Sequence, residues 1–172
     1  MIVYTDGSCK KNKRIKDFSK QPKGGIGIFW GDDNPFNISE PFIQYPVTNI
    51  RTELYACIKA IQIFYQNFIE TETETLTIYD DYLTIYTDSK FTINAMTKWV
   101  EGWKKHNWKK ANGKPVQNID LISQLNELIN RYPNKIRFEY IRAHQKEPED
   151  LFSDTYKHWY GNMMADKLAT QN

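Results

Sequence analysis

The sequence has few cysteines and no long apolar run, and both absences exclude whole classes of protein. Only Cys9 and Cys57 occur among the 172 residues, and no Cys-x-x-Cys pair is present. Two cysteines cannot form a disulfide framework, and without Cys-x-x-Cys a zinc ribbon is excluded. The chain does not open with a basic segment followed by an apolar one, and no apolar run could span a bilayer. We therefore expect an intracellular, soluble protein without membrane contact.

The composition is that of an ordinary globular protein, but its charge is unevenly distributed. Hydrophobic residues make up 40% of the chain and charged residues 26%, and the net charge is +2. At this length we expect one domain over residues 1–172, large enough to bury a proper core. Basic residues gather in Lys10–Lys23 and again in Lys104–Lys114. A basic surface on a near-neutral protein indicates a polyanionic partner.

Two short apolar segments each end in a Thr-Asp pair. Ile2–Thr5 is followed by Asp6 and a glycine, and Leu83–Thr87 is followed by Asp88 and a serine. Because β-branched and aromatic residues favour strands, both carboxylates are expected at strand ends. An Asp-Gly pair on its own is typical of a hairpin turn. The recurrence of the pattern favours a shared metal site.

Apolar periodicity and turn residues predict the remaining elements. The expected elements are strands at 2–5, 24–31, 36–45, 83–86 and 136–141 and helices at 51–68, 89–99, 118–132 and 161–169. The first three strands are expected to form an antiparallel meander whose third strand, interrupted by Pro41, lies at an edge. Residues 76–79 repeat the pattern of 83–86 and form either an extra strand or a lengthened entry to that strand.

Two further carboxylates and one histidine are candidates for the same site. Glu53 is expected in the first turn of its helix, where the helix dipole favours an acid even when that acid has no other role. The alternative is that Glu53 points toward the sheet edge. Asp166 lies on the closing helix. Clustered carboxylates without Cys or paired His ligands select Mg²⁺ or Mn²⁺ over Zn²⁺. His144, in a polar loop after a strand, is either a residue without a role or a proton shuttle for a leaving 3′-oxygen.

Lysine and tryptophan alternate between residues 99 and 110, a pattern that is not typical of a core. Trp99, Trp103 and Trp108 are interleaved with lysines, and an Asn-Gly-Lys-Pro turn follows. One interpretation is a solvated basic helix whose tryptophans pack on their neighbours. We favour a protruding arm, in which ammonium groups contact phosphates and indole faces contact sugars or bases.

Taken in order, these segments resemble the catalytic domain of type 1 ribonuclease H. The matching segments are Tyr4–Ser8, Gly25–Gly27, Thr48–Leu54, Tyr86–Ser89, Trp99–Lys110, Lys114–Val116 and Gly161–Ala169. Each segment alone is a weak signal, but the ordered set covers nearly the whole chain and is specific. The resemblance implies an α/β fold in which helices flank a mixed sheet of five strands. It also implies hydrolysis of the RNA strand of RNA–DNA hybrids with two Mg²⁺ ions, leaving 5′-phosphate and 3′-hydroxyl ends.

Carried over by position, the resemblance implies roles for residues of this chain. The metal ligands would be Asp6, Glu53, Asp88 and Asp166, with His144 as the mobile catalytic histidine. The implied nucleic-acid contacts are Cys9, Asn12 and Asn49 on RNA and its 2′-hydroxyls, Phe91, Trp99 and Trp103 in a DNA-strand channel, Thr48 and Asn118 on a DNA phosphate, and Lys104, Lys105, Lys109 and Lys110 in a basic protrusion. The implied partner is an RNA–DNA hybrid, bound by a monomer.

The chain departs from the family pattern in several places. Ile50 stands where a polar base-contacting residue is usual, and Pro46 stands where some members carry an arginine. Arg142–Gln145 lacks the usual glycines on both sides of the histidine, and an acidic and aromatic insertion lengthens the gap to Asp166. No separate hybrid-binding domain precedes Ile2, so we expect low processivity.

Three alternatives remain open from the sequence. An integrase or transposase core would share the fold and act on DNA, but such cores usually carry three acids and lack the Trp-Lys protrusion. A catalytically silent hybrid-binding module needs cations rather than the four carboxylates found here. The third alternative is a ribonuclease H domain cut from a reverse transcriptase polyprotein, although Met1 favours a free-standing protein.

Overall fold

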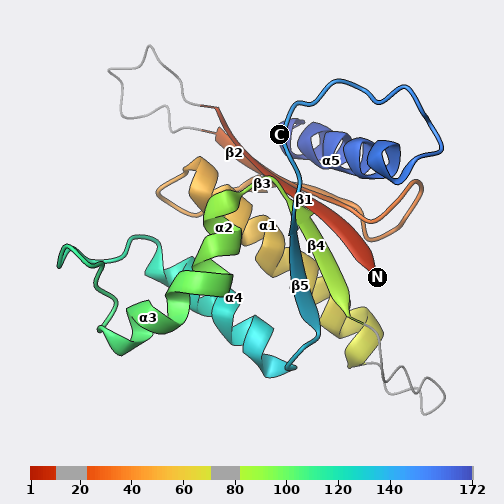
Figure 1. Ribbon diagram of the computed structural model, residues 1–172. Helices are drawn as coiled ribbons and strands as arrows, with labels where there is room; N and C mark the ends of the chain where they lie inside the picture. Colours follow the sequence, from red (N-terminus) through yellow and green to blue (C-terminus); the bar gives the residue numbers. More distant parts are fainter. Residues whose placement is uncertain (11–22, 71–81, 172) are drawn as a thin grey trace.

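One mixed sheet organises residues 1–10, 23–70 and 82–171, which the computed structural model describes (Figure 1). Its strands are β1 (Ile2–Lys10), β2 (Lys23–Phe29), β3 (Ile38–Phe42), β4 (Leu83–Thr87) and β5 (Ile136–Tyr140). They lie in the order β3-β2-β1-β4-β5. The first three strands pair antiparallel, and β4 and β5 run parallel to β1. The five-stranded mixed sheet and the antiparallel meander are therefore confirmed.

Helices cover both faces of the sheet. They are α1 (Asn49–Phe64) with its π-helical continuation η1 (Tyr65–Ile69), α2 (Lys90–Asn94) with η2 (Ala95–Trp99), α3 (Val100–Lys105), α4 (Ile119–Arg131) and α5 (Asp154–Thr170). Figure 1 shows α1, α2 and α4 on one side of the sheet and α5 on the other. The larger apolar cluster fills the α1 side, and a smaller one built on Tyr4, Phe29 and Ala165 fills the α5 side.

Helix starts follow the local sequence closely where a hydroxyl residue stands at the cap. The Thr48 side chain accepts a hydrogen bond from the Arg51 backbone N–H at the start of α1. The Ser89 side chain does the same for the Thr92 N–H at the start of α2. Each cap satisfies a backbone donor that would otherwise be free.

The closing helix is longer than predicted. The sequence pattern predicts a helix only from Gly161, but α5 begins at Asp154, where the Ser153 side chain accepts from the Tyr156 N–H. The added turns contact the sheet through His158 and Tyr160, whose rings lie beside those of Tyr4 and Phe29. Residues 154–160, expected to be part of a polar loop, are therefore helical. The basic loop 11–22 and the repeated segment 76–79 lie outside the described residues.

Glycines allow the helices on both faces to approach the sheet closely. A Cβ on Gly27 of β2 would lie within 3.0 Å of the α5 backbone at Ala165 and Ala169. A Cβ on Gly7 of β1 would lie equally close to the α1 backbone at Glu53. These two positions therefore require glycine, because any side chain would push a helix away from the sheet. No helix among the described residues combines the length and the apolarity that crossing a membrane requires.

Candidate active site

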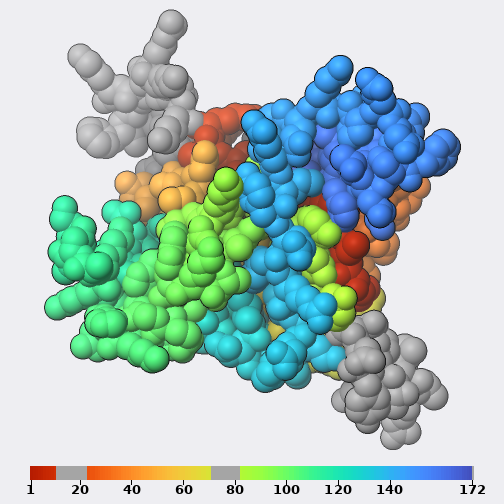
Figure 2. All heavy atoms as spheres, in the orientation of Figure 1, coloured from red at the N-terminus to blue at the C-terminus, as the bar shows by residue number. Residues whose placement is uncertain are grey.

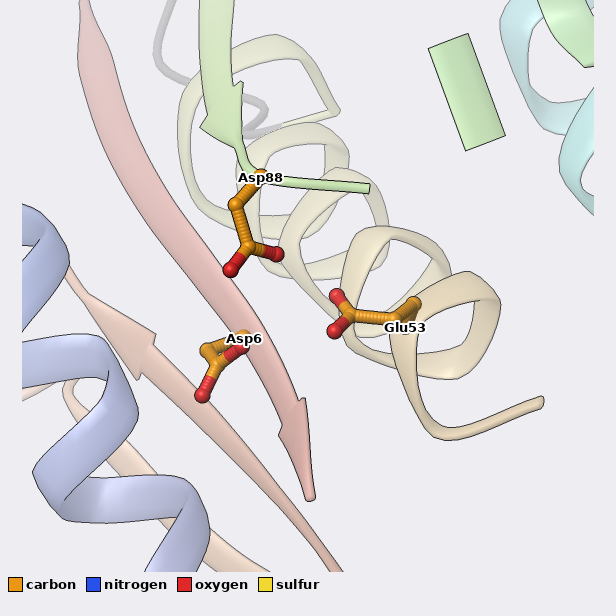
Figure 3. Close-up of side chains that lie close together, drawn as sticks. All are labelled: Asp6, Glu53 and Asp88. Carbon is orange, nitrogen blue, oxygen red and sulfur yellow. The ribbon is translucent and has the colours of Figure 1, made fainter. Parts of the chain in front are cut away.

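Three carboxylates from three elements meet where β4 ends beside the middle of β1 (Figure 3). Asp6 projects from β1, Asp88 follows β4, and Glu53 projects from α1. One oxygen of each lies within 4.8 Å of the other two, and Asp6 and Glu53 are each only 8% exposed. Thr5 of β1 pairs with Thr87 of β4, so Asp6 and Asp88, which follow these two residues, lie beside each other. The predicted clustering of Asp6, Asp88 and Glu53 is confirmed, but the expected position of Asp6 at a strand end is wrong, because β1 continues through Asp6 to Lys10 in its pairing with β2.

Glu53 does not have the position expected of an acid placed for the helix dipole. The first turn of α1 contains no acidic residue, because the helix begins at Asn49, earlier than predicted. Glu53 therefore lies beyond that turn, on the buried face directed at β1. The close approach at Gly7 brings the α1 backbone at Glu53 against β1, beside Asp6. The prediction that Glu53 sits in the first turn is wrong, and its alternative orientation toward the sheet edge is the observed one.

Asp166 and His144 line the same cavity. The cavity has a volume of about 320 Å³, and both residues line it together with the three clustered carboxylates. Asp166 comes from α5, and its charge contributes to raising the pKa of Asp6. His144 follows β5, and Figure 2 shows this segment lying over the molecule between α2 and α5. The residues 142–145, after β5, and 159, 162 and 163, on α5, also line the cavity.

Burial and mutual repulsion hold protons on the clustered acids. Burial, followed by the charges of Asp88 and Asp166, raises the pKa of Asp6 to about 7. Burial and the neighbouring Asp6 raise the pKa of Glu53 well above its ordinary value. Burial also raises the pKa of Asp88, although the nearby His144 acts in the opposite direction. Such a cluster is unfavourable while it is charged and uncompensated.

The donor set fits hard divalent cations. All the clustered ligand atoms are carboxylate oxygens, which Mg²⁺ and Mn²⁺ prefer. The Glu53 Oε2 atom is buried and has no hydrogen-bond partner among the described residues. A buried carboxylate oxygen left in this state is costly unless a cation or a proton satisfies it. Asp6, Glu53 and Asp88 could therefore hold a metal ion, with Asp166 beside them.

The residues predicted to contact RNA lie partly at the same cavity. Cys9 and Asn49 line it with the carboxylates. Asn12, the third such residue, lies outside the described residues. Cys9 is half-buried on β1, two residues after Gly7. Its thiol contacts the Val47 carbonyl oxygen at 3.5 Å. The structure therefore places Cys9 and Asn49 within reach of a ligand bound at the acids.

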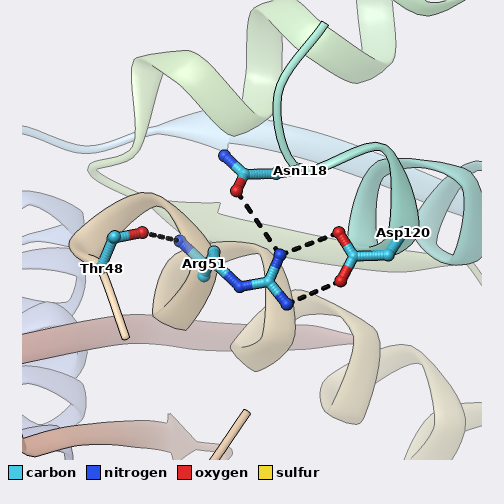
Figure 4. A network of polar contacts seen from close by, with 4 residues as sticks. All are labelled: Thr48, Arg51, Asn118 and Asp120. Atoms are coloured by element: carbon cyan, nitrogen blue, oxygen red, sulfur yellow. Dashed lines mark hydrogen bonds and ion pairs between the residues drawn. The ribbon is translucent and has the colours of Figure 1, made fainter. Parts of the chain in front are cut away.

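Thr48 and Asn118, predicted to hold a DNA phosphate, are joined through a buried arginine (Figure 4). Arg51 is only 4% exposed, and its two terminal nitrogens donate to Asp120 at 2.8 and 2.6 Å. The Arg51 guanidinium also reaches Asn118 Oδ1 at 3.5 Å, and the Arg51 backbone N–H donates to Thr48 Oγ1 at 3.3 Å. This pairing with Arg51 lowers the pKa of Asp120. Arg51 thus links α1 to the start of α4, and Asn118 turns its amide nitrogen away from it.

The segment 99–110 has features of both predicted arrangements, the solvated helix with packed tryptophans and the protruding arm. Trp103 and Trp108 are half-buried and pack against the main core, as a solvated helix with packed tryptophans would require. Trp99 is 39% exposed and contacts the rings of Phe91 and Trp103 at 5.9 and 5.5 Å. The four predicted lysines are exposed on α3 and on the loop after it, which projects away from the sheet in Figure 1. The predicted protrusion is therefore confirmed in shape, with an aromatic cluster at its base.

Several residues at the site were not singled out from the sequence. Arg51 and Asp120 form the buried link described above, and Trp159 lines the acidic cavity from α5. Trp159 precedes Asp166 by seven residues, which places both on one face of a helix. That spacing was readable in the sequence only once the helix was known to begin before Trp159. Arg51 carries no pattern that distinguishes it from a surface arginine.

Comparison with known proteins places this architecture in one family. A sequence model of the RNase H family matches residues 1–172. Ribonuclease H1 of Mus musculus is 36% identical over 99% of this chain, which covers 49% of the mouse protein. Ribonuclease H of Ruthia magnifica subsp. Calyptogena magnifica is 30% identical, with 99% of this chain and 98% of that protein covered. The chain therefore spans about half the length of the mammalian relatives that it matches, and nearly all of the bacterial one.

Solved structures agree with the sequence relatives. The RNase H domain of PFV has a TM-score of 0.67 and 25% identity, over 99% of this chain and 92% of that domain. LC11-RNase H1, solved in complex with an RNA/DNA hybrid, has a TM-score of 0.56 and 16% identity, over 99% of this chain and 94% of that one. The first likeness supports the sequence relationship, and the second shows the shared fold. With the profile match over its whole length and the bacterial relative at full coverage, this chain belongs to the RNase H family.

Proposed function

We propose that this protein is an endonuclease that hydrolyses the RNA strand of RNA–DNA hybrids with two bound Mg²⁺ ions. The observation that carries the proposal is the cluster of Asp6, Glu53 and Asp88, whose oxygens lie within 4.8 Å of one another in a chain of the RNase H family. A module that only bound a hybrid would gain nothing from buried acids, because they repel phosphate. The membership of the family favours a ribonuclease over an integrase core.

The acids would hold the ions, and other residues would hold the substrate. Asp6, Glu53, Asp88 and Asp166 are the proposed ligands. Bound Mg²⁺ would supply the activation of a water and the stabilisation of the leaving oxygen of the phosphodiester. Mn²⁺ is a possible substitute because it takes the same oxygen ligands. We propose that the products carry 5′-phosphate and 3′-hydroxyl ends.

Residues around the acids would orient the two strands. Cys9 and Asn49, at the cavity, would contact the RNA strand, and a contact with its 2′-hydroxyl would distinguish RNA from DNA. Thr48 and Asn118 would donate to a phosphate of the DNA strand, with Arg51 holding the two together. His144, at the open side of the cavity, would pass a proton from its imidazole to the departing 3′-oxygen.

A substrate panel tests the proposal directly. The protein should cut the labelled RNA strand of an RNA–DNA hybrid in Mg²⁺, and it should leave RNA duplex, DNA duplex and single-stranded RNA intact. EDTA should abolish the cutting, because the carboxylates alone cannot activate water. End analysis of the fragments should show 5′-phosphates. Tight binding of the hybrid without cutting in either Mg²⁺ or Mn²⁺ would instead identify a binding module.

The basic protrusion should account for part of the salt dependence of hybrid binding. Lys109 and Lys110 are exposed on the projecting loop. Replacing both by alanine should reduce the slope of log affinity against log salt by about one per lost phosphate contact. Fluorescence anisotropy with a labelled hybrid in EDTA measures this slope without cleavage. The control is Lys59→Ala, which removes a lysine that pairs with Glu40 at 3.3 Å and should leave the slope unchanged. Equal slopes for the wild type, the double variant and the control would contradict a nucleic-acid contact at the loop.

A further inference from the structure

The loop that carries His144 has an unusual backbone for its sequence. His144 has a φ of 50°, in the left-handed region, although no glycine stands at or beside it. A side chain other than glycine or asparagine adopts this region at a cost, so neighbouring contacts must hold it there. Arg142, His144 and Gln145 are exposed, so packing around the loop is open to solvent. Hydrogen bonds from this loop and to it contribute to holding its conformation.

Two hydrogen bonds fix the residue that follows the histidine. The Gln145 side-chain nitrogen donates to the Arg142 carbonyl at 3.1 Å and closes the turn around His144. The Trp159 indole nitrogen donates to the Gln145 carbonyl at 3.0 Å and ties this turn to α5. The second bond spans fourteen residues of sequence and is made by a rigid side chain with few rotamers. It therefore fixes the loop against a helix rather than against another loop.

The same helix face carries a proposed metal ligand. Trp159 and Asp166 are seven residues apart on α5 and both line the acidic cavity with His144 and Asp88. The Tyr156 ring packs against the Trp159 ring at 5.4 Å, which helps to set the direction of the indole N–H. One helix thus carries both a proposed metal ligand and the hydrogen-bond donor to the histidine loop.

We infer that Trp159 is a positioning residue for His144: its indole N–H, bonded to the Gln145 carbonyl, holds the histidine at the acidic cavity in place of the loop glycines that the chain lacks. The inference rests on the proposed function, because it assigns the histidine to the cleavage step. Trp159 acts through the loop backbone and need not touch the substrate. The early start of α5 at Asp154 is what brings Trp159 to the loop.

Trp159→Phe tests this tether, the hydrogen bond from the Trp159 indole N–H to the Gln145 carbonyl, because phenylalanine retains an aromatic ring but has no N–H. The loss of one partly exposed hydrogen bond should lower kcat by roughly five- to tenfold and leave KM within about twofold. Hydrogen exchange at residues 143–147 should become faster, while the Tm stays close to that of the wild type. Trp30→Phe is the matched control: the Trp30 indole N–H has no hydrogen-bond partner among the described residues, so kcat and loop exchange should not change.

A double-mutant cycle shows whether Trp159 acts through His144. His144→Ala should lower kcat, and in that background Trp159→Phe should cause no further loss. An equal loss from Trp159→Phe with and without His144 would overturn the inference, as would a His144→Ala enzyme of full activity. Unchanged loop exchange in Trp159→Phe would also overturn it. Failure of the wild-type protein to cut any hybrid would refute the proposed function instead, and the exchange measurement would still decide whether the tether exists.

Discussion

Asp6→Asn should abolish cleavage and at the same time stabilise the metal-free protein. The substitution removes a charged ligand from the centre of the cluster, where the bound ions would contribute several kcal/mol to the transition state. At a factor of ten for each ~1.4 kcal/mol, we expect kcat to fall on the order of a thousandfold or more. Gel assays with the labelled hybrid in Mg²⁺ measure this loss. They also show that no contaminating nuclease cuts the hybrid in the wild-type preparation.

The effect on stability has the opposite sign and depends on pH. The pKa of Asp6 is about 7 in the folded protein and near 3.8 ordinarily, so between these values the folded state binds more protons than the unfolded state. The free energy of unfolding therefore falls as the pH rises through this window, and the stabilising effect of the proton is lost above pH 7. Asparagine carries no charge at any pH. We expect the variant to unfold about 5 to 10 °C higher than the wild type at pH 8 in EDTA.

Two controls separate this effect from a general change in stability. Near pH 4 Asp6 of the folded wild type is protonated and therefore uncharged like asparagine, so the two proteins should unfold at nearly the same temperature. Added Mg²⁺ at pH 8 should raise the Tm of the wild type more than that of the variant, because binding to the folded state stabilises it. A variant that is less stable than the wild type at pH 8 in EDTA would show that the acids do not repel one another.

Gly7→Ala should destabilise the fold and displace Glu53. The added Cβ would lie within 3.0 Å of the α1 backbone at Thr52 and Glu53, and backbone atoms cannot rotate away as a side chain can. Overpacking of this kind typically costs about 1–3 kcal/mol, against which the better strand propensity of alanine returns less than about 1 kcal/mol. We expect the Tm to fall by about 5 °C or more, as measured by thermal circular dichroism.

The activity of Gly7→Ala should fall even at temperatures where the protein is folded. A small shift of α1 away from β1 carries Glu53 away from Asp6, and the proposed metal site loses its geometry. Gly102→Ala is the matched control, because a Cβ at this position in α3 meets nothing within 4 Å and alanine favours a helix. That variant should be as stable as the wild type and fully active. Equal stability of the two variants would contradict close packing at Gly7.

Much of the sheet and two of its acids could be read from local sequence. Asp6 and Asp88 each follow an apolar segment that forms a strand, and the two strands are parallel neighbours in which Thr5 pairs with Thr87. Asp88 does end its strand, but β1 continues past Asp6 to Lys10, because it pairs with β2 beyond the end of β4. The position of Glu53 could not be read from the sequence in the same way. The helix begins at Asn49, earlier than predicted, so the predicted first-turn position of Glu53 was wrong. The buried face of α1 repeats at helical spacing, so Glu53 could be placed toward the sheet but not at a particular distance from it.

Residues that act through long-range contacts could not be identified in this way. Arg51 looks like a surface residue in sequence, and only the docking of α4 against α1 buries it beside Asp120. Trp159 lies in a stretch that reads as a polar loop, and only packing against β1 and β2 makes it helical. The spacing of apolar residues along the sequence indicates which face of a single helix or strand is buried. The contacts of Arg51 and Trp159 depend instead on how two separate elements pack against each other.

The sequence by itself determined the ligand chemistry of this protein, and the tertiary structure decided its geometry. The near absence of cysteine, together with acids that follow apolar segments, already favours oxygen ligands and hard cations, because those preferences belong to the side chains. Whether three carboxylates come within 4.8 Å depends on how closely α1 packs on β1, which the lack of a side chain at Gly7 permits. How the histidine loop is held depends on a hydrogen bond from a helix fourteen residues further along the chain. Such contacts are decided by the packing of the whole fold, because neither partner has a local preference for the other.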